Sequence, residues 1–465
     1  MSKVLLINPP TGVYIRDDRC QVPVRGLTSS LRMPLDLAYM ATAFLRYDWQ
    51  TKIGDYQAYV DGLARFKKDL KEFQPDYLIV SVTTPTLLSD MAICMQARQL
   101  KPDLKIIVKG AHITAKAEEV LTQFPFVDVA IINEYEKVAG QLAQNLSLQQ
   151  IQGVVFRNEG QVVVNPSAEL NLDLDELGMP ARQLIDNALY TRPDTGELQT
   201  SILTSRGCRN RCSFCLVSFL SGSHVANRTS GSVIQEIEQC LAQFKISNFY
   251  FRADTFTWDR EWVIDLCEKI IKLKLPIQWV CNSRVDTIDL ELAQIMRQAG
   301  CWMIGFGIES GQQQILDQVA KNIDSEQIEK AIQDCKEAGL KTYLFYILNL
   351  PGENLISLEQ TLKLNQNLKP DFAEFHLAYP FPGTKLYDMV IREGLISDQE
   401  LYNADVFNFY LPNPNLTIDQ LKRFRQKAIK QMYLRPSYIW QTLKQIKSFT
   451  QLKNYCKKGF EVISK

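Results

Sequence analysis

The chain has 465 residues, of which 46% are hydrophobic and 22% charged, and its formal net charge is zero. This composition predicts a globular protein of two or three domains and excludes a disordered or fibrous chain. No apolar run reaches the roughly 18 residues of a membrane span, and the first residues lack the apolar stretch of a secretory signal. We therefore expect a cytoplasmic protein.

The first part of the chain alternates short apolar runs with stretches of helical periodicity. Strands are predicted at 3–8, 76–82, 105–108 and 127–132. Strands that alternate with helices in this way indicate a parallel sheet whose ligands bind at the carboxyl ends of the strands. We expect a Rossmann-like domain over residues 1–148, with its site in the loops after the strands.

A hairpin is predicted at 150–166, where two valine-containing runs flank the polar turn RNEG. Residues 167–197 contain glycine and proline without clear periodicity. We expect 149–197 to be a hairpin followed by a linker.

A second alternation of strands and helices follows over residues 198–395. Six strands are predicted, at 201–206, 248–254, 277–283, 301–308, 342–350 and 372–379. Six strand-helix units predict an open (β/α)6 barrel, two units short of a closed barrel. Its chemistry is expected at the carboxyl ends of the strands.

Residues 396–465 are predicted to form a helical, basic region. Within 421–465 there are twelve Lys or Arg residues and a single acidic one, Glu461, so this tail carries a net charge of +11. A run of charge is most often the solvated face of a helix. The interleaved aromatic residues also suit a lipid headgroup or a single-stranded nucleic acid.

The eleven cysteines are scattered and odd in number, which argues against a disulfide framework. Cys94, Cys240, Cys267 and Cys335 lie within apolar helical patterns and are expected in the core. Three others, Cys208, Cys212 and Cys215, form a C-x3-C-x2-C set directly after the first predicted barrel strand. Only this group has the spacing of metal ligands.

Three thiolates on one loop can ligate three irons of a four-iron cluster and leave the fourth iron open. S-adenosylmethionine (SAM) can chelate an open iron through its amino and carboxylate groups, and an electron from the cluster then cleaves it to a radical. The alternatives are coincidental cysteines and a structural zinc site. Zinc requires four ligands, and His224 is the only nearby candidate for the fourth.

At these residues the chain resembles the cobalamin-binding type of radical SAM enzyme, in the group of the anaerobic magnesium-protoporphyrin cyclase and the hopanoid-modifying enzymes. The resemblance covers nearly the whole chain. It includes the segments ADTFTWD (253–259), CNSRVD (281–286), GFGIESG (305–311), LPGE (350–353) and YPFPGT (379–384).

The resemblance implies roles for single residues at the barrel mouth. Phe214 would pack beside the adenine of SAM, and Asp254 would lie near its amino group. Arg284 and Glu309 would line the SAM or substrate cavity, although glycines around Glu309 also suit a plain structural turn. His376 and Tyr379 are expected to face the substrate, while a buried structural role is the alternative for His376.

The resemblance also implies cobalamin at the carboxyl edge of the first domain, over Thr11, Asp55, Ser81, Gly110 and Asn133. The loop 54–60 reads GDYQAYV and contains no histidine, so no protein imidazole is expected on cobalt. The family's glycine-rich loops appear as KGAH (109–112) and NEYE (133–136). A cofactor-free Rossmann-like domain is the alternative.

We therefore expect a radical SAM enzyme that modifies an unactivated carbon of a hydrophobic, lipid-like or natural-product substrate, by C-methylation or by radical rearrangement or cyclisation. Its expected cofactors are a [4Fe-4S] cluster, SAM and cobalamin, and its reductant would be a flavodoxin or ferredoxin. The resemblance favours an anionic membrane over nucleic acid as the partner of the basic tail.

Two alternative functions fit the same residues. A peptide-modifying enzyme of the epimerase type would return a hydrogen atom from a cysteine in the substrate cavity near the barrel mouth, Cys281 or Cys301. A non-catalytic iron-sulfur redox protein would hold the cluster without cleaving SAM.

Overall fold

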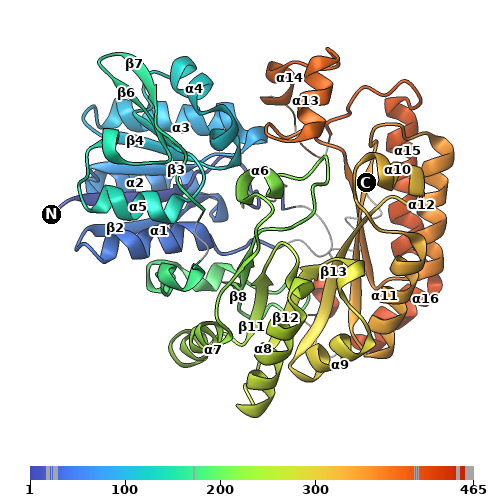
Figure 1. The fold of residues 1–465 in the computed structure, drawn as a ribbon. Coiled ribbons are helices and arrows are strands. Elements are labelled where there is room, and N and C mark those ends of the chain that lie inside the picture. The colour runs from blue at the N-terminus through green and yellow to red at the C-terminus, as the bar shows by residue number, and fades with distance from the viewer. Residues whose placement is uncertain are drawn as a thin grey trace.

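Two large sheets, the first mostly and the second wholly parallel, are each packed against helices and lie side by side (Figure 1). The structure is a computed structural model. It describes residues 1–16, 21, 23–24, 30–170, 173–402, 404, 406, 408–446 and 451–455. Cys20, Cys456 and the last ten residues of the basic tail lie outside the described residues.

The first sheet has the strand order β2-β1-β3-β4-β5-β6-β7, with β1 to β5 parallel and the last two strands antiparallel. The central strands are apolar and buried because helices cover both faces of the sheet. Strand β2 has the polar sequence QTKIGD and was not predicted; it lies at the sheet edge, where burial demands less apolar character. The strands are β1 (Lys3–Asn8), β2 (Gln50–Asp55), β3 (Tyr77–Ser81), β4 (Lys105–Lys109), β5 (Val129–Ile131), β6 (Val154–Asn158) and β7 (Gln161–Val164).

Five helices cover this sheet. Apolar residues of α1 and α5 form one core with it, and those of α2, α3 and α4 form another. The helices are α1 (Leu35–Leu45), α2 (Gly62–Phe73), α3 (Leu87–Leu100), α4 (Ala111–Gln123) and α5 (Tyr135–Ala143). The Rossmann-like expectation is confirmed. The hairpin expected between the domains instead pairs with β5 and extends the first sheet.

The second sheet is the open barrel, with six parallel strands in the order β15-β14-β13-β12-β11-β8. This confirms the predicted (β/α)6 topology. The strands are β8 (Gln199–Leu203), β11 (Asn248–Arg252), β12 (Gln278–Ser283), β13 (Cys301–Glu309), β14 (Lys341–Leu348) and β15 (Phe372–Leu377). The predicted strand 201–206 is divided, because β9 (Ser205–Arg206) leaves the barrel and pairs with β10 (Ala226–Asn227).

Helices lie between successive barrel strands. Apart from α6, whose Leu220 packs with Ala111 and Leu216, these helices contribute buried residues to the barrel core, which includes Cys240, Cys267 and Cys335 as expected. The helices are α6 (Val217–Ser221), α7 (Ser230–Gln239), α8 (Arg260–Lys272), α9 (Leu290–Gln298), α10 (Gln313–Gln318), α11 (Ser325–Glu337) and α12 (Leu355–Leu368).

The C-terminal helices pack on both sheets. Helices α13 (Lys385–Arg392) and α14 (Asp398–Tyr402) share a core with the first sheet. Helix α15 (Ile418–Tyr433) packs against β15 and buries Leu421, Phe424 and Met432 in the barrel core, and α16 (Pro436–Gln445) follows it.

A buried ion triad joins the first domain, the linker and the barrel. Glu236 of α7 accepts hydrogen bonds from both Arg182, in the linker turn η5 (Arg182–Leu184), and Arg228. The three side chains are at most 1% exposed. Arg182 also donates to the carbonyl of Ser201 in β8, and Arg228 donates to the hydroxyl of Tyr39 in α1 at 3.4 Å.

We predict that Glu236→Gln will lower the free energy of unfolding by about 3–5 kcal/mol, because it leaves the buried Arg182 without a carboxylate and Arg228 with only Asp175, at 3.6 Å. Chemical denaturation followed by circular dichroism measures this. The matched control is Glu291→Gln, since Glu291 is 83% exposed in its pair with Arg260 and its loss should cost less than about 1 kcal/mol. Equal effects of the two variants would contradict the assigned role of the triad.

Candidate functional site

The three cysteines of the C-x3-C-x2-C set line one cavity at the carboxyl ends of the barrel strands. Cys208, Cys212 and Cys215 are each half-buried, and all three contribute to the same cavity wall. The loop is held in place through its backbone: the amide of Ser213 donates to the carbonyl of Val319, and that of Leu386 donates to the carbonyl of Ser213. The fold therefore brings together the residues that the sequence pattern selected.

Burial disfavours the charged form of two of these thiols and raises the pKa of both Cys212 and Cys215. Burial, together with the neighbouring Cys212, Asp254 and Cys208, raises the pKa of Cys215 to about 12. Positively charged iron would stabilise the thiolate form, as metal ions do for coordinated thiols. Within the described residues, no three His, Cys, Asp or Glu side chains gather closely enough to hold a single metal ion.

Asp254 fixes the start of the cysteine loop. Its Oδ2 accepts a hydrogen bond from the amide of Gly207 at 2.6 Å, and its Oδ1 lies 3.7 Å from Nη1 of Arg252. Gly207 has φ +102°, and a Cβ there would lie 1.8 Å from the carbonyl oxygen of His224. The turn before Cys208 therefore requires glycine.

Arg284 and Glu309 line the same cavity, together with Lys321, which the sequence did not single out. Glu309 accepts a hydrogen bond from Nζ of Lys321 at 2.7 Å, and both side chains are at most 8% exposed. Arg284 is paired with Asp286 at 2.8 Å and donates to the carbonyl of Lys321. Burial tends to lower the pKa of Lys321, but attraction by Glu309 and Cys212 raises it above its usual value.

Gly307 of β13 leaves room for this ion pair because it has no side chain. A Cβ at Gly307 would come within 2.3 Å of Oε1 of Glu309 and 2.8 Å of Nζ of Lys321. Glu309 itself has φ +69°, next to a register shift between β13 and β14. Lys321 lies in a polar turn without periodicity, so no sequence signal connects it with Glu309.

Other residues expected at the barrel mouth lie at different depths. Phe214, His376 and Tyr379 line the cavity. Nε2 of His376 lies 3.0 Å from Oε2 of Glu374, and the hydroxyl of Tyr379 donates to the carbonyl of Leu401. Cys281 also reaches the cavity wall.

Cys301, expected at the barrel mouth, is fully buried near the start of β13, where it packs in the barrel core. It is not among the residues that line the cavity.

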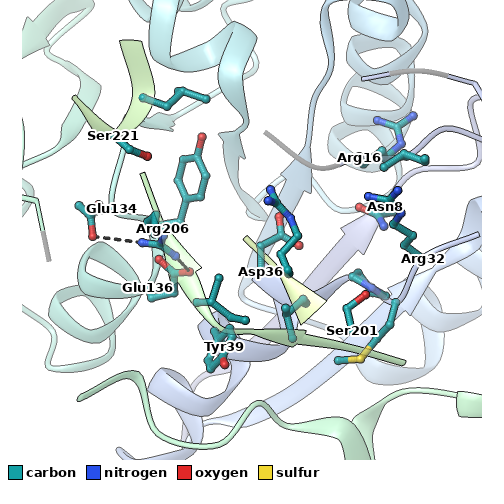
Figure 2. Close-up of a pocket in the computed structure, with 18 of the residues that line it drawn as sticks. Asn8, Arg16, Arg32, Asp36, Tyr39, Glu134, Glu136, Ser201, Arg206 and Ser221 are labelled. Carbon is teal, nitrogen blue, oxygen red and sulfur yellow. Dashed lines mark hydrogen bonds and ion pairs between the residues drawn. The ribbon is translucent and has the colours of Figure 1, made fainter. Parts of the chain in front are cut away.

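A smaller cavity of about 100 Å³ lies between the carboxyl edge of the first sheet and the barrel. Figure 2 shows Arg206, which comes just before the cysteine loop, reaching two acids of the first domain. Its guanidinium lies 3.3 Å from Glu134 and 2.8 Å from Glu136. This pair of contacts connects the cysteine loop with the loop that follows β5.

Of the five residues expected at this edge of the first sheet, Asn133 lines the smaller cavity. Thr11 donates to Asp90, whose carboxylate is also paired with Arg16. Asp55 is buried and accepts from the hydroxyl of Tyr190 in the linker at 2.8 Å.

Ser81 and Gly110 lie deeper in the first domain. The side chain of Ser81 is buried at the end of β3. A Cβ on Gly110 would lie 2.2 Å from the carbonyl oxygen of Val82. Any larger residue at Gly110 would therefore disturb the backbone before it touched a ligand.

The smaller cavity is lined by acceptors that have no hydrogen-bond partner within the described chain. They are Oδ1 of Asn8, Oδ1 of Asn133 and Oε2 of Glu136. Buried acceptors are costly unless a donor meets them. The amide side chains around a corrin ring carry such N–H donors, so these residues fit cobalamin at this edge. The smaller cavity also shares Ile15, Arg32, Met33, Ser201 and Arg252 with the larger one.

Two family models match the chain: the radical SAM superfamily over residues 202–364 and the B12 binding domain over residues 30–143. The chain is 28% identical to an uncharacterised methyltransferase of Pyrococcus horikoshii, over 94% of both chains. It is 26% identical to the anaerobic magnesium-protoporphyrin IX monomethyl ester cyclase of Rubrivivax gelatinosus, over 82% of this chain and 69% of the relative.

Solved structures show the same fold. The radical SAM methyltransferase TsrM from Kitasatospora setae, with cobalamin and a [4Fe-4S] cluster bound, matches with a TM-score of 0.67 and 19% identity, over 84% of this chain and 78% of that one. The cobalamin-dependent radical SAM enzyme OxsB matches with a TM-score of 0.71 and 16% identity, over 99% and 71%.

Proposed function

Because the chain belongs to the radical SAM superfamily and carries a B12-binding domain, we propose that it transfers a methyl group from SAM to an unactivated carbon of a small apolar molecule. The observation that carries this proposal is the shared wall between two cavities. The larger one contains the cysteine set, and the smaller one lies at the corrin-binding edge of the first domain. The cofactors are a [4Fe-4S] cluster, SAM and cobalamin.

We assign Cys208, Cys212 and Cys215 as the ligands of three irons. When bound, the cofactors supply reductive cleavage of SAM and methyl-group transfer. The carboxylates of Asp254 and Glu309 suit the amino group of SAM. The cations Arg284 and Lys321 suit its carboxylate, and Phe214 suits the face of its adenine.

Arg206 acts in this proposal as a positioning residue. Its contacts with Glu134 and Glu136 hold the cysteine loop at a fixed distance from the carboxyl edge of the first sheet. Methyl transfer requires such a distance, because reaction rates fall steeply when reacting groups are misplaced.

Radical cyclisation is a second candidate function. The observation in its favour is the 26% identity with the cyclase of Rubrivivax gelatinosus. The epimerase-type alternative is not favoured: the relatives are methyltransferases and a cyclase, and Cys301 lies in the core. The redox-protein alternative is likewise not favoured, because the relatives are enzymes.

A small-molecule substrate and a source of electrons are needed for this chemistry, and we propose a flavodoxin or ferredoxin as reductant, in the cytoplasm. No described helix is long and apolar enough to cross a membrane. We propose domain boundaries at 1–148, 149–197, 198–395 and 396–465, with the hairpin 154–164 as a structural extension of the first sheet.

Changing Cys208, Cys212 or Cys215 to Ala is predicted to abolish the visible charge-transfer absorbance of the anaerobically reconstituted protein, because each thiolate holds one iron. Iron analysis and absorption spectra measure this. Cys267→Ala is the matched control, since Cys267 is buried in the barrel core and should leave the iron content unchanged. Full iron retention in all three loop variants would contradict the assignment.

The reduced, reconstituted enzyme with added cobalamin is predicted to release S-adenosylhomocysteine and 5′-deoxyadenosine from SAM. Arg206→Gln should lower the S-adenosylhomocysteine yield by about tenfold or more, because the first domain is no longer held against the cysteine loop. The 5′-deoxyadenosine yield should fall much less. Liquid chromatography of the quenched reactions measures both products.

The control for this experiment is Arg260→Gln, which removes a surface ion pair with Asp289 and Glu291. It should leave both yields unchanged. A wild-type preparation that retains its cluster yet releases neither product would contradict the proposed function.

We also propose that α16 contacts an anionic membrane surface. Ile439, Trp440 and Leu443 are 44–61% exposed on this helix, beside Lys444. The surrounding tail is strongly basic. Exposed apolar side chains next to lysines are typical of helices that lie in a membrane interface.

Liposome flotation is predicted to recover the protein with anionic but not with neutral vesicles, and recovery should fall as salt rises, since screening is strong beyond about 10 Å at 0.1 M salt. Trp440→Ser combined with Leu443→Ser should reduce the recovery. These substitutions are preferable to removing the tail from Asp419, because that truncation would delete the buried face of α15. Equal recovery with both vesicle types would contradict the proposal.

A further inference from the structure

Three helices meet on the outer side of the barrel, away from the cysteine loop. α12, α15 and α16 lie near one another in Figure 1, and α15 contacts both of the others. A surface groove lies at the C-terminal ends of α12 and α15, and we call it the α12–α15 groove. Its lining includes Asn365, Lys369, Lys430 and Arg435, and none of the described residues that line it is acidic.

Positive charge gathers at the α12–α15 groove. The side chains of Lys369 and Lys430 are exposed, and their ammonium groups have no hydrogen bond or ion pair within the part of the chain that the structure describes. Lys336 of α11 lies near two groove cations: burial lowers its pKa, and Arg435 and Lys369 lower it further. Asp371 opposes this effect by raising the pKa. Because like charges repel, an anion in the groove would stabilise this arrangement.

Cations near the end of a helix also stabilise its last carbonyl groups. Lys336 donates to the carbonyl of Leu368, and Nη2 of Arg435 donates to that of Pro370 at 2.7 Å. These bonds occupy one donor group on each of two cations. The two exposed lysines of the groove make no such bond, so capping of the helices does not account for them.

Two buried polar atoms of the groove residues have no hydrogen-bond partner within the described chain. They are Nε of Arg435 and Oδ1 of Asn365, a residue that is 1% exposed. Unpaired buried polar groups are costly. A guanidinium nitrogen is suited to a phosphate oxygen, and an amide oxygen is suited to a hydroxyl group. The groove therefore complements a ligand that carries both a phosphate and a hydroxyl group.

The apolar surroundings of the groove indicate where such a phosphate comes from. Arg435 directly precedes α16, which exposes Ile439, Trp440 and Leu443. Leu434, which lines the groove, is itself 40% exposed. Cations beside exposed apolar side chains are typical of protein surfaces that bind anionic lipids. This continuity favours a phospholipid over a soluble phosphate ester.

We propose that the α12–α15 groove binds the headgroup of an anionic phospholipid. Its phosphate lies against Lys369, Lys430 and Arg435, and a hydroxyl of the headgroup donates to Asn365. This inference deepens the proposed membrane contact of α16 and rests on it for the source of the phosphate. Phosphatidylglycerol carries both of the groups that the groove complements.

Isothermal titration of the anaerobically reconstituted full chain tests the inference with soluble lipids below their micelle concentration. Dihexanoyl phosphatidylglycerol should bind most tightly. Dihexanoyl phosphatidylmethanol, which lacks the hydroxyl groups, should bind about threefold or more weakly, because Asn365 then stays unpaired. Inorganic phosphate should bind at least about tenfold more weakly than phosphatidylglycerol, because it has no acyl chains. Equal affinity for inorganic phosphate and phosphatidylglycerol would assign the groove to soluble phosphates and overturn the lipid as ligand.

Variants of the groove residues show where the lipid binds. Lys369→Gln combined with Lys430→Gln should weaken binding of phosphatidylglycerol by about tenfold or more. Arg435→Lys keeps the charge but removes Nε, and it should weaken binding by about fivefold. The matched control is Lys363→Gln combined with Lys422→Gln, which removes two exposed lysines of the same helices outside the groove. The unfolding midpoint shows whether each variant is folded.

Unchanged affinity in the folded groove variants, or an equal loss in the control, would overturn the inference. Liposome flotation of the same wild-type preparation separates this inference from the proposed membrane contact. A protein that floats with anionic vesicles but does not bind the soluble lipid retains the membrane contact and overturns the groove as a headgroup site. A protein that binds the soluble lipid in the groove but floats equally with anionic and neutral vesicles overturns the membrane contact, while the headgroup site remains.

Discussion

The buried triad of Arg182, Glu236 and Arg228 sets the geometry on which the candidate site depends. A carboxylate with two guanidinium groups in a dry interior is stable only when every group is paired. Arg182 comes from the linker, Glu236 from α7, and Arg228 from the residues just before α7. The hydroxyl of Tyr39 in α1 accepts a hydrogen bond from Arg228. The first domain, the linker and the barrel therefore have one compatible arrangement around this point.

In that arrangement the carboxyl edge of the first sheet faces the mouth of the barrel. Ligands of open parallel sheets and of barrels bind at the carboxyl ends of strands, so both binding edges meet in one region. Arg206 crosses the gap to Glu134 and Glu136 directly before the cysteine loop begins. The loop that holds the cysteines is thereby connected to the first domain as well as to its own barrel.

Small residues determine how the barrel interior is used. Gly307 makes room for the Glu309–Lys321 pair, and Gly305 makes room for the ring of Phe345. With side chains at these positions, the mouth would lose its charged pair and the barrel interior would be narrower.

The sequence by itself determined the fold class, because each central strand is an apolar run followed by a stretch of helical periodicity. It also selected the cysteine set, because the spacing of these ligands along one loop is a local feature of the sequence. It missed β2, whose edge position relaxes the demand for apolar residues. Only the tertiary structure connected Lys321 with Glu309 and Arg206 with Glu134, and only it placed Cys301 in the core. These facts depend on which distant side chains meet across a cavity or a domain boundary, and no periodicity along the chain encodes such a meeting.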